Sequence, residues 1–324
     1  KLTKEDIVAF ADKYLKEDNY AVVYKKQGKD PNEKKMTKPE ITPIVSNRDV
    51  ASPFLTSIQE NAVKPIEPVF LDFKKDMSQL TAKSDIPVLY KQNTTNDLFQ
   101  LIYVFDMGNN NDKALGTAFD YLEYLGTSDM TPEELKSEFY RLACTFYVSP
   151  GNERTYVVLS GLNENMPAAM QLFEKLLADA QVNKEAYDNL VGDILKARAD
   201  AKLNQGQNFS RLMNYAMYGP KSPATNLLTE AELASMNPQE LVDRIHNQNN
   251  YKHRILYYGP SSSKDLLATI DQYHQVPATL KDIPAGNEFS YLETPATKVL
   301  VAPYEAKQIY MAQISNLDKK YDPA

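Results

Sequence analysis

A stretch rich in proline and lysine divides this chain of 324 residues. Proline fixes its own backbone and donates no amide hydrogen bond, so such a stretch is excluded from long helices and central strands. We therefore expect residues 29–68 to form an extended linker. This linker holds six prolines, which are Pro31, Pro39, Pro43, Pro53, Pro65 and Pro68.

Strand-like and helix-like segments both occur after residue 69, so we expect a unit that combines strands and helices. Residues 87–90 and 98–105 read as a hairpin whose polar turn spans 93–97. The other predicted strands are 155–160 and 254–258, and the predicted helices are 113–125, 165–180, 184–203 and 209–218. Residues 205–208 read as a loop between two of these helices. Capping boxes at Thr131–Glu134 and Thr229–Glu232 mark two further helix starts.

Two weak internal echoes suggest a repeated domain. Near the start, a helix over 3–14 and a strand over 20–24 precede Gly28, and the same order recurs before Gly259, 231 residues later. The second echo pairs the strand at 87–90 with one at 298–301, each followed by a strand that contains glutamine, the later one over 308–314. The abrupt start of the chain suggests a fragment of a longer protein.

Charge and hydropathy narrow the classes of partner. The formal net charge is −7, whereas binding to nucleic acid phosphates requires a basic face, so we expect no nucleic-acid partner. No run of about 18 apolar residues is present, so no membrane span is predicted. The single Cys144 follows two apolar residues and reads as a buried, inert thiol.

The chain is poor in the residues that build catalytic metal sites. It has three histidines, and His246 and His253 lie two helical turns apart, too far to reach one metal from one helix. His246 reads as a surface residue of an amphipathic helix. We therefore expect no metal site and no catalytic site within this chain.

The order of motifs resembles the insulinase/pitrilysin family of zinc peptidases, the inverzincins. Residues 116–127 resemble the family's helix bearing H-x-x-E-H, which is also followed shortly by Gly-Thr. Residues 154–165 resemble the strand that precedes its long helix. The stretches 218–220 and 229–241 resemble its conserved loop and final helix, and 290–314 resembles the opening strands of a following domain.

In the family motif two histidines four residues apart bind zinc, and the glutamate acts as general base. Here Asp120 and Tyr124 occupy the histidine positions and only Glu123 remains. A phenol must lose a proton of pKa about 10 before it can replace an imidazole as a ligand. The family's third ligand is a glutamate on a later helix, and Asp193 lies in the corresponding region. The resemblance therefore implies a degenerate site with no metal.

The resemblance also implies an architecture and a role. It predicts an α+β fold, a mitochondrial-processing-peptidase-like domain that has an antiparallel β-sheet with long helices packed on it. Residues 1–28 would end a preceding domain, 29–68 would be the linker, 69–285 would be a complete inactive domain, and 286–324 would open the next. The chain would be the non-catalytic lobe of a metalloendopeptidase, partnered by an N-terminal catalytic half that holds zinc, and it would bind peptide substrates in an enclosing chamber.

Three alternatives stay open. The chain could be an inactive scaffold or partner subunit of a processing-peptidase-like complex. It could be a carboxylate-based hydrolase that uses Glu123 with Asp120, or these residues could form only the solvated face of an amphipathic helix. The compartment is also open: a bacterial periplasm or cell envelope is favoured, and the cytoplasm is possible.

Overall fold

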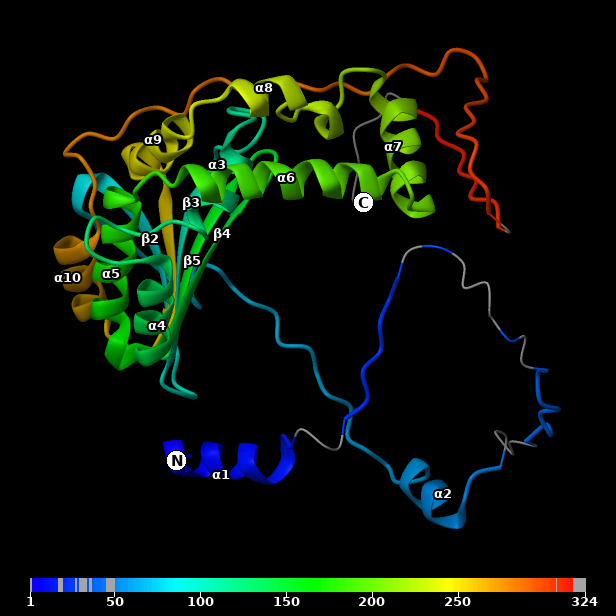
Figure 1. Cartoon of the computed structure of the whole chain (residues 1–324). Helices are drawn as coiled ribbons and strands as arrows, with labels where there is room; N and C mark the ends of the chain where they lie inside the picture. Colours follow the sequence, from blue (N-terminus) through cyan, green and yellow to red (C-terminus); the bar gives the residue numbers. More distant parts are fainter. Residues whose placement is uncertain are drawn as a thin grey trace. The chain divides into compact units, whose positions relative to one another are not determined.

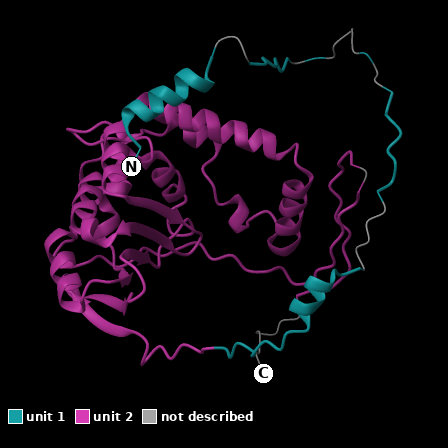
Figure 2. Cartoon of the chain, turned by 90° about the horizontal axis from the view of Figure 1, so that it is seen from below, with its two compact units in different colours: residues 1–68 teal, residues 69–324 magenta. Residues whose placement is uncertain are grey.

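The chain divides into two units, residues 1–68 and 69–324 (Figure 2). The computed structural model describes residues 2–16, 20–26, 28, 34, 37–44, 50–306 and 308–316. Within these residues no helix is long and apolar enough to cross a membrane. The finer division into a preceding domain, a linker and a following domain stays a prediction.

Among its described residues, the first unit contains two short helices, α1 (Lys4–Tyr14) and α2 (Pro53–Gln59). The side chain of Thr3 caps α1, and the carboxylate of Asp6 accepts from the Thr3 backbone N–H in return. The helix α2 corrects the expectation of a wholly extended linker. Ser52 caps it and Pro53 stands in its first turn, the one place in a helix where proline is well tolerated.

The second unit is an α+β unit, as the sequence predicts. Within its described residues the strands are β1 (Ser78–Ala82), β2 (Ile86–Gln92), β3 (Leu98–Phe105), β4 (Cys144–Pro150), β5 (Thr155–Leu162) and β6 (Arg254–Gly259). The helices are α3 (Leu115–Leu122), α4 (Pro132–Arg141), α5 (Met166–Asp179), α6 (Lys184–Ala201), α7 (Gln205–Tyr218), α8 (Glu230–Ser235), α9 (Gln239–Asn247) and α10 (Ser263–Tyr273). Short 3₁₀ turns connect several of them.

The six strands form one sheet in the order β1-β2-β6-β3-β5-β4. All neighbours are antiparallel except β2 and β6, which are parallel. The predicted hairpin of β2 and β3 is therefore wrong, because β6 lies between them. The connection crosses over the end of β6, where the amide N–H of Asn93 donates to the carbonyl of Gly259 at 2.8 Å. Local sequence cannot reveal a strand inserted from about 150 residues away.

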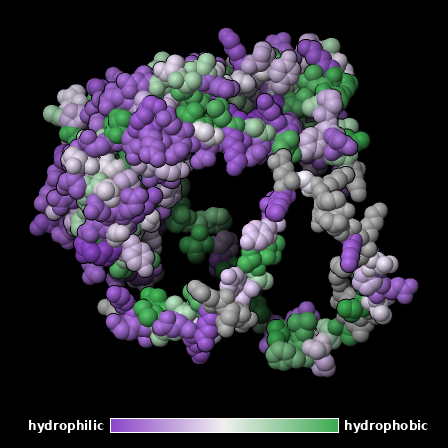
Figure 3. All heavy atoms as spheres, in the orientation of Figure 1, coloured by the Kyte–Doolittle hydropathy of each residue, from purple (hydrophilic) through white to green (hydrophobic). Residues whose placement is uncertain are grey.

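The core lies between one face of this sheet and the helices (Figure 1). Every second residue of the central strands is buried there, including Leu101, Tyr103, Leu159 and Ile255. The outer surfaces around α4, α5 and α9 are mostly hydrophilic, as the left side of Figure 3 shows. Burial of one stripe per helix thus orders these helices on one side of the sheet.

Several boundaries differ from the prediction. The helix predicted over 113–125 is shorter, since α3 runs from Leu115 to Leu122. Residues 205–208 are not a loop but the first turn of α7, which the side chain of Asn204 caps. The described residues of 20–24, 298–301 and 308–314 form no strands. A strand is held by its ladder to a partner, and the described residues offer these segments none.

Candidate functional site

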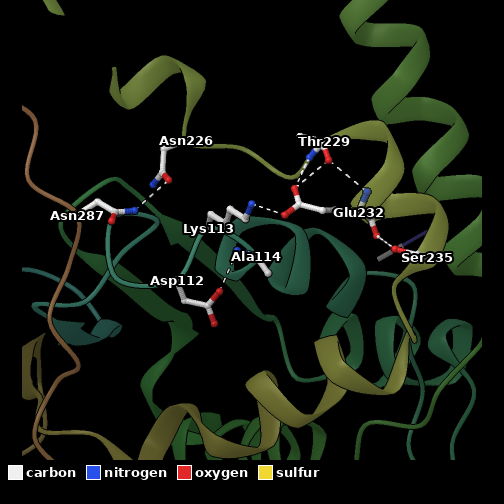
Figure 4. Close-up of polar contacts among 8 residues, drawn as sticks. All are labelled: Asp112, Lys113, Ala114, Asn226, Thr229, Glu232, Ser235 and Asn287. Atoms are coloured by element: carbon white, nitrogen blue, oxygen red, sulfur yellow. Dashed lines mark hydrogen bonds and ion pairs between the residues drawn. The ribbon is translucent and has the colours of Figure 1, made fainter. Parts of the chain in front are cut away.

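Two polar contacts hold the start of α3, the helix whose sequence resembles the zinc-binding helix of the insulinase/pitrilysin family. Lys113 forms an ion pair with Glu232, whose carboxylate also accepts bonds from the backbone and side chain of Thr229 (Figure 4). One residue earlier, Asp112 accepts from the guanidinium of Arg244 at 2.7 Å. These contacts tie the start of α3 to α8 and α9, so the position of α3 is set by tertiary contacts.

The structure places the three motif residues at the exposed end of α3. Asp120 lies in the last turn and is exposed, while its neighbours Phe119 and Tyr121 are buried in the core. Glu123 is the C-cap and is exposed. Tyr124 lies beyond the helix, where its amide N–H donates to the carbonyl of Tyr121 at 3.0 Å in a tighter turn. Tyr124, four residues after Asp120, therefore lies outside the helix, whereas H-x-x-E-H requires both ligands on one helical face.

Asp193 does not join these residues in a site. It is exposed on α6. Contact between α3 and α6 is made instead by Tyr121, whose hydroxyl donates to the carbonyl of Asn183 at 2.6 Å and whose ring meets Tyr187 edge-on. Asp193 is six residues further along α6 than Tyr187, or about 9 Å.

The residues present do not fit a zinc ion. In the described part of the chain, no three His, Cys, Asp or Glu side chains are grouped so that they could hold a metal. Although the Asp120 side chain reaches solvent, desolvation by the neighbouring protein raises the pKa of its carboxyl group, and the charge of Glu123 adds to this increase. Three cavities of the unit, of about 710, 450 and 360 Å³, are lined by other residues. An acidic, solvated end of a helix accounts for what is observed there.

A sheet edge lies next to α3. Strand β4 pairs with β5 on one side only and ends the sheet. Two backbone hydrogen bonds fix the ladder: the N–H of Leu162 donates to the carbonyl of Ala143, and the N–H of Gly151 donates to the carbonyl of Arg154. Because bonded and non-bonded residues alternate along an antiparallel strand, the odd-numbered residues of β4 bond to β5. The backbone groups of Phe146 and Val148 therefore point outward, and nothing among the described residues bonds to them.

The side chains of β4 hold this edge in place. Phe146 packs against Phe139 and Phe173, with ring centroids 4.9 and 4.8 Å apart. Cys144 is buried, as predicted, and burial raises the pKa of its thiol. Pro150 is the next residue of β4 whose backbone points outward, and proline has no amide proton. The row of outward N–H donors therefore ends before Pro150. This edge presents main-chain donors and acceptors on a rigid support.

Two of the three histidines meet in the core, which the sequence did not suggest. His253 and His274 approach each other through their Nε2 atoms at 2.9 Å, and His274 contacts the buried carboxylate of Glu174. One signal was available in the sequence. Glu174 lies four residues after Met170 and three before Leu177, so it occupies a core position in the helical pattern of α5.

Comparison with solved structures gives the class of fold. The second unit has the fold of M16-type peptidase domains, and its similarity to them is confined to the fold because sequence identities are low. The periplasmic protease PqqL from Escherichia coli matches with a TM-score of 0.60 and 15% identity over 92% of this chain and 31% of that one. An M16 peptidase inactive domain from Pseudomonas fluorescens matches with a TM-score of 0.54 and 15% identity over 67% of this chain and 53% of that one.

A third structure is that of a point mutant of the ferredoxin protease FusC in complex with Arabidopsis ferredoxin. It gives a TM-score of 0.58 and 12% identity over 90% of this chain and 30% of that one. The chain thus spans about a third of the length of PqqL and of FusC. No family model and no curated protein sequence matches it.

Proposed function

We propose that the chain is a non-catalytic lobe of a zinc metallopeptidase of the insulinase/pitrilysin type, and that it binds extended peptide along the outer edge of β4. Zinc and the catalytic groups would belong to a separate catalytic half, and the two halves would enclose the peptide. The fold shared with M16-type structures, among them an inactive domain, supports the assignment to a lobe. The likeness to PqqL, a periplasmic protease, supports a periplasmic location.

The outer edge of β4 is the observation that carries the peptide-binding proposal. Phe146 and Val148 each offer an N–H and a C=O in the spacing that an added strand would match. Main-chain bonding of this kind gives affinity with little dependence on peptide sequence, which suits a lobe that holds many substrates. Tyr147, which is 51% exposed, would contact side chains of the peptide on the other face of the sheet.

Two variants of one residue test the edge. Val148→Pro removes an outward N–H but no bond of the ladder to β5, whereas Val148→Thr has nearly the same shape and keeps the N–H. Binding of a fluorescein-labelled, unstructured peptide to the full chain is measured by anisotropy. Loss of one main-chain hydrogen bond of about 0.5–1.5 kcal/mol predicts roughly 2- to 12-fold weaker binding for Val148→Pro alone.

Each outcome decides a different part of the proposal. Equal binding by both variants would place the peptide elsewhere, and no binding by the native chain would exclude peptide holding. The second result would favour the scaffold or partner-subunit role. Stoichiometric zinc in the purified chain, or peptide cleavage by it alone, would contradict its assignment as a non-catalytic lobe.

A further inference from the structure

A buried carboxylate lies at the centre of the second unit. Glu174 on α5 is fully buried and takes part in four hydrogen bonds. Its Oε1 accepts from the Tyr103 hydroxyl at 3.0 Å and contacts Nδ1 of His274 at 2.6 Å. Its Oε2 accepts from the Asn249 amide at 2.9 Å and from the Gln275 backbone N–H at 3.0 Å. Donors from Tyr103, Asn249 and Gln275 converge on its two oxygens, an environment that favours an ionised carboxylate.

Hydrogen-bond roles then fix the protons on the two histidines. With Glu174 ionised, Nδ1 of His274 donates to it. Nδ1 of His253 must also donate, because it contacts the carbonyl oxygen of Tyr251 at 2.7 Å. The two Nε2 atoms are 2.9 Å apart, so one of them carries a proton. Three protons on four ring nitrogens make one of the two rings a cation.

The cation belongs on His274. This ring is fully buried and touches the Glu174 carboxylate directly, so its charge balances the buried anion. His253 is then neutral and accepts at Nε2. Burial, with the neighbouring His274, lowers the pKa of His253 to about 4, which agrees with this assignment. With Glu174 ionised and each ring protonated only on Nδ1, two lone pairs would face each other and the buried carboxylate would have no counter-ion.

We propose that Glu174, His274 and His253 form an acid-sensitive latch that is closed by one proton between the two histidines. The latch joins α5 to the end of α10 and to the residue before β6. A second proton, taken up by His253 in acid, sets two cations face to face and releases the end of α10. Beside the latch lies a cavity of about 450 Å³ whose lining includes Glu174, His274 and Asn249, so release would open this cavity.

The surroundings leave few other groups that could neutralise the second charge. Phe105 and Tyr103 pack against the histidine rings, with Phe105 4.6 Å from His253 and Tyr103 4.3 Å from His274 between centroids. Burial and the charge of Glu174 raise the pKa of Tyr103, so it stays a neutral donor. The titratable or charged groups that face the latch or its cavity come from several elements: Tyr103 on β3, Glu174 on α5, His246 on α9, His274 after α10, and Lys83. The ammonium group of Lys83 donates to the backbone carbonyl of Asp271.

Nitrogen-15 NMR of the full chain labelled in histidine tests the proton assignment, and only three imidazoles give signals. At pH 8 we expect one ring protonated at both nitrogens, His274, and one neutral ring with the proton on Nδ1, His253. His246 should carry its proton on Nε2, which contacts the Ala180 carbonyl at 3.1 Å. The variant Glu174→Gln should lose the cationic signal at pH 8, and the exposed control Glu164→Gln should keep it. No cationic ring at pH 8 in the native chain would overturn the proposal, even if Glu174→Gln does not fold.

Amide hydrogen exchange tests the acid response. The N–H of Gln275, which donates to Glu174, should be protected at pH 7 and should lose at least about tenfold in protection at pH 4, after correction for intrinsic rates. In His253→Gln the side-chain oxygen still accepts from His274 and cannot titrate, so protection should persist at pH 4. Equal loss of protection in the native chain and in this variant would exclude the latch as the cause.

Discussion

Replacement of His253 by glutamine should make the second unit less sensitive to acid. In the folded chain the pKa of His253 is lowered to about 4 from an ordinary value of 6.5, chiefly by burial. Between these two values the unfolded chain binds a proton that the folded chain does not. Stability contributed by neutral His253 is therefore present above pH 6.5 and is lost as the pH falls towards 4.

The size of this loss follows from the two pKa values. His253 is only 7% exposed, so little solvent screening reduces it. At about 1.4 kcal/mol per pH unit, proton linkage gives a loss of roughly 2 kcal/mol by pH 5 and roughly 3 kcal/mol by pH 4, relative to pH 7.5. His253→Gln should lack this component, although the substitution itself lowers stability by a constant amount at all pH values.

Urea unfolding followed by circular dichroism at pH 7.5, 5 and 4 measures the effect. Subtracting the variant from the native chain cancels the carboxylates that titrate in both. His246→Gln, which removes the histidine outside the latch, should show the full native loss. Parallel stability–pH curves for the native chain and His253→Gln would refute the reasoning, because they would mean that His253 does not gain a proton on unfolding.

Three further substitutions test the packing and charges around the site. Phe173→Ala removes a ring that is 1% exposed and should lower the free energy of unfolding by about 3–5 kcal/mol, measured with urea. Gly161→Ala should cost about 2–4 kcal/mol in the same assay, because Gly161 has φ +153° and a Cβ there would lie 2.4 Å from the carbonyl oxygen of Ala143. Lys113→Met should raise the pKa of Glu232, which Lys113 and Thr229 lower from 4.5 to about 2, as carbon-13 NMR of the carboxyl group would show. Stability from Glu232 is present above pH 4.5 and lost towards pH 2, so the variant should also lose less stability over that range.

Local patterns in the sequence predicted most elements of the second unit. The capping boxes at Thr131 and Thr229 form as expected, since they depend on residues three apart. The position of β6 between β2 and β3 could not be predicted, because strand order depends on pairing between distant segments. The end of α3 was also predicted at the wrong residue. Contacts with the rest of the unit replace its last predicted helical turn, and such contacts cannot be seen in the local sequence.

The candidate site was predicted only in part. The sequence located the positions Asp120, Glu123 and Tyr124, and the structure shows an exposed acidic helix end there. The latch was not predicted, because 79 residues separate Glu174 from His253 and only the fold brings them together. Peptide binding was predicted from the resemblance, without naming a strand or the residues that would bind.

The fold and the missing metal site are compatible because they use different faces of α3. One face of α3 is buried and holds the helix on the sheet, and it consists of Leu115, Ala118, Phe119 and Leu122. On the other face, Asp120 and Glu123 face solvent. In the proposed lobe, an exposed face without ligands removes no core contact, so the scaffold can persist without a metal. The outer edge of β4 depends only on that scaffold, since its donors and acceptors are main-chain groups. Peptide holding by such a lobe therefore requires the fold and not the ligands.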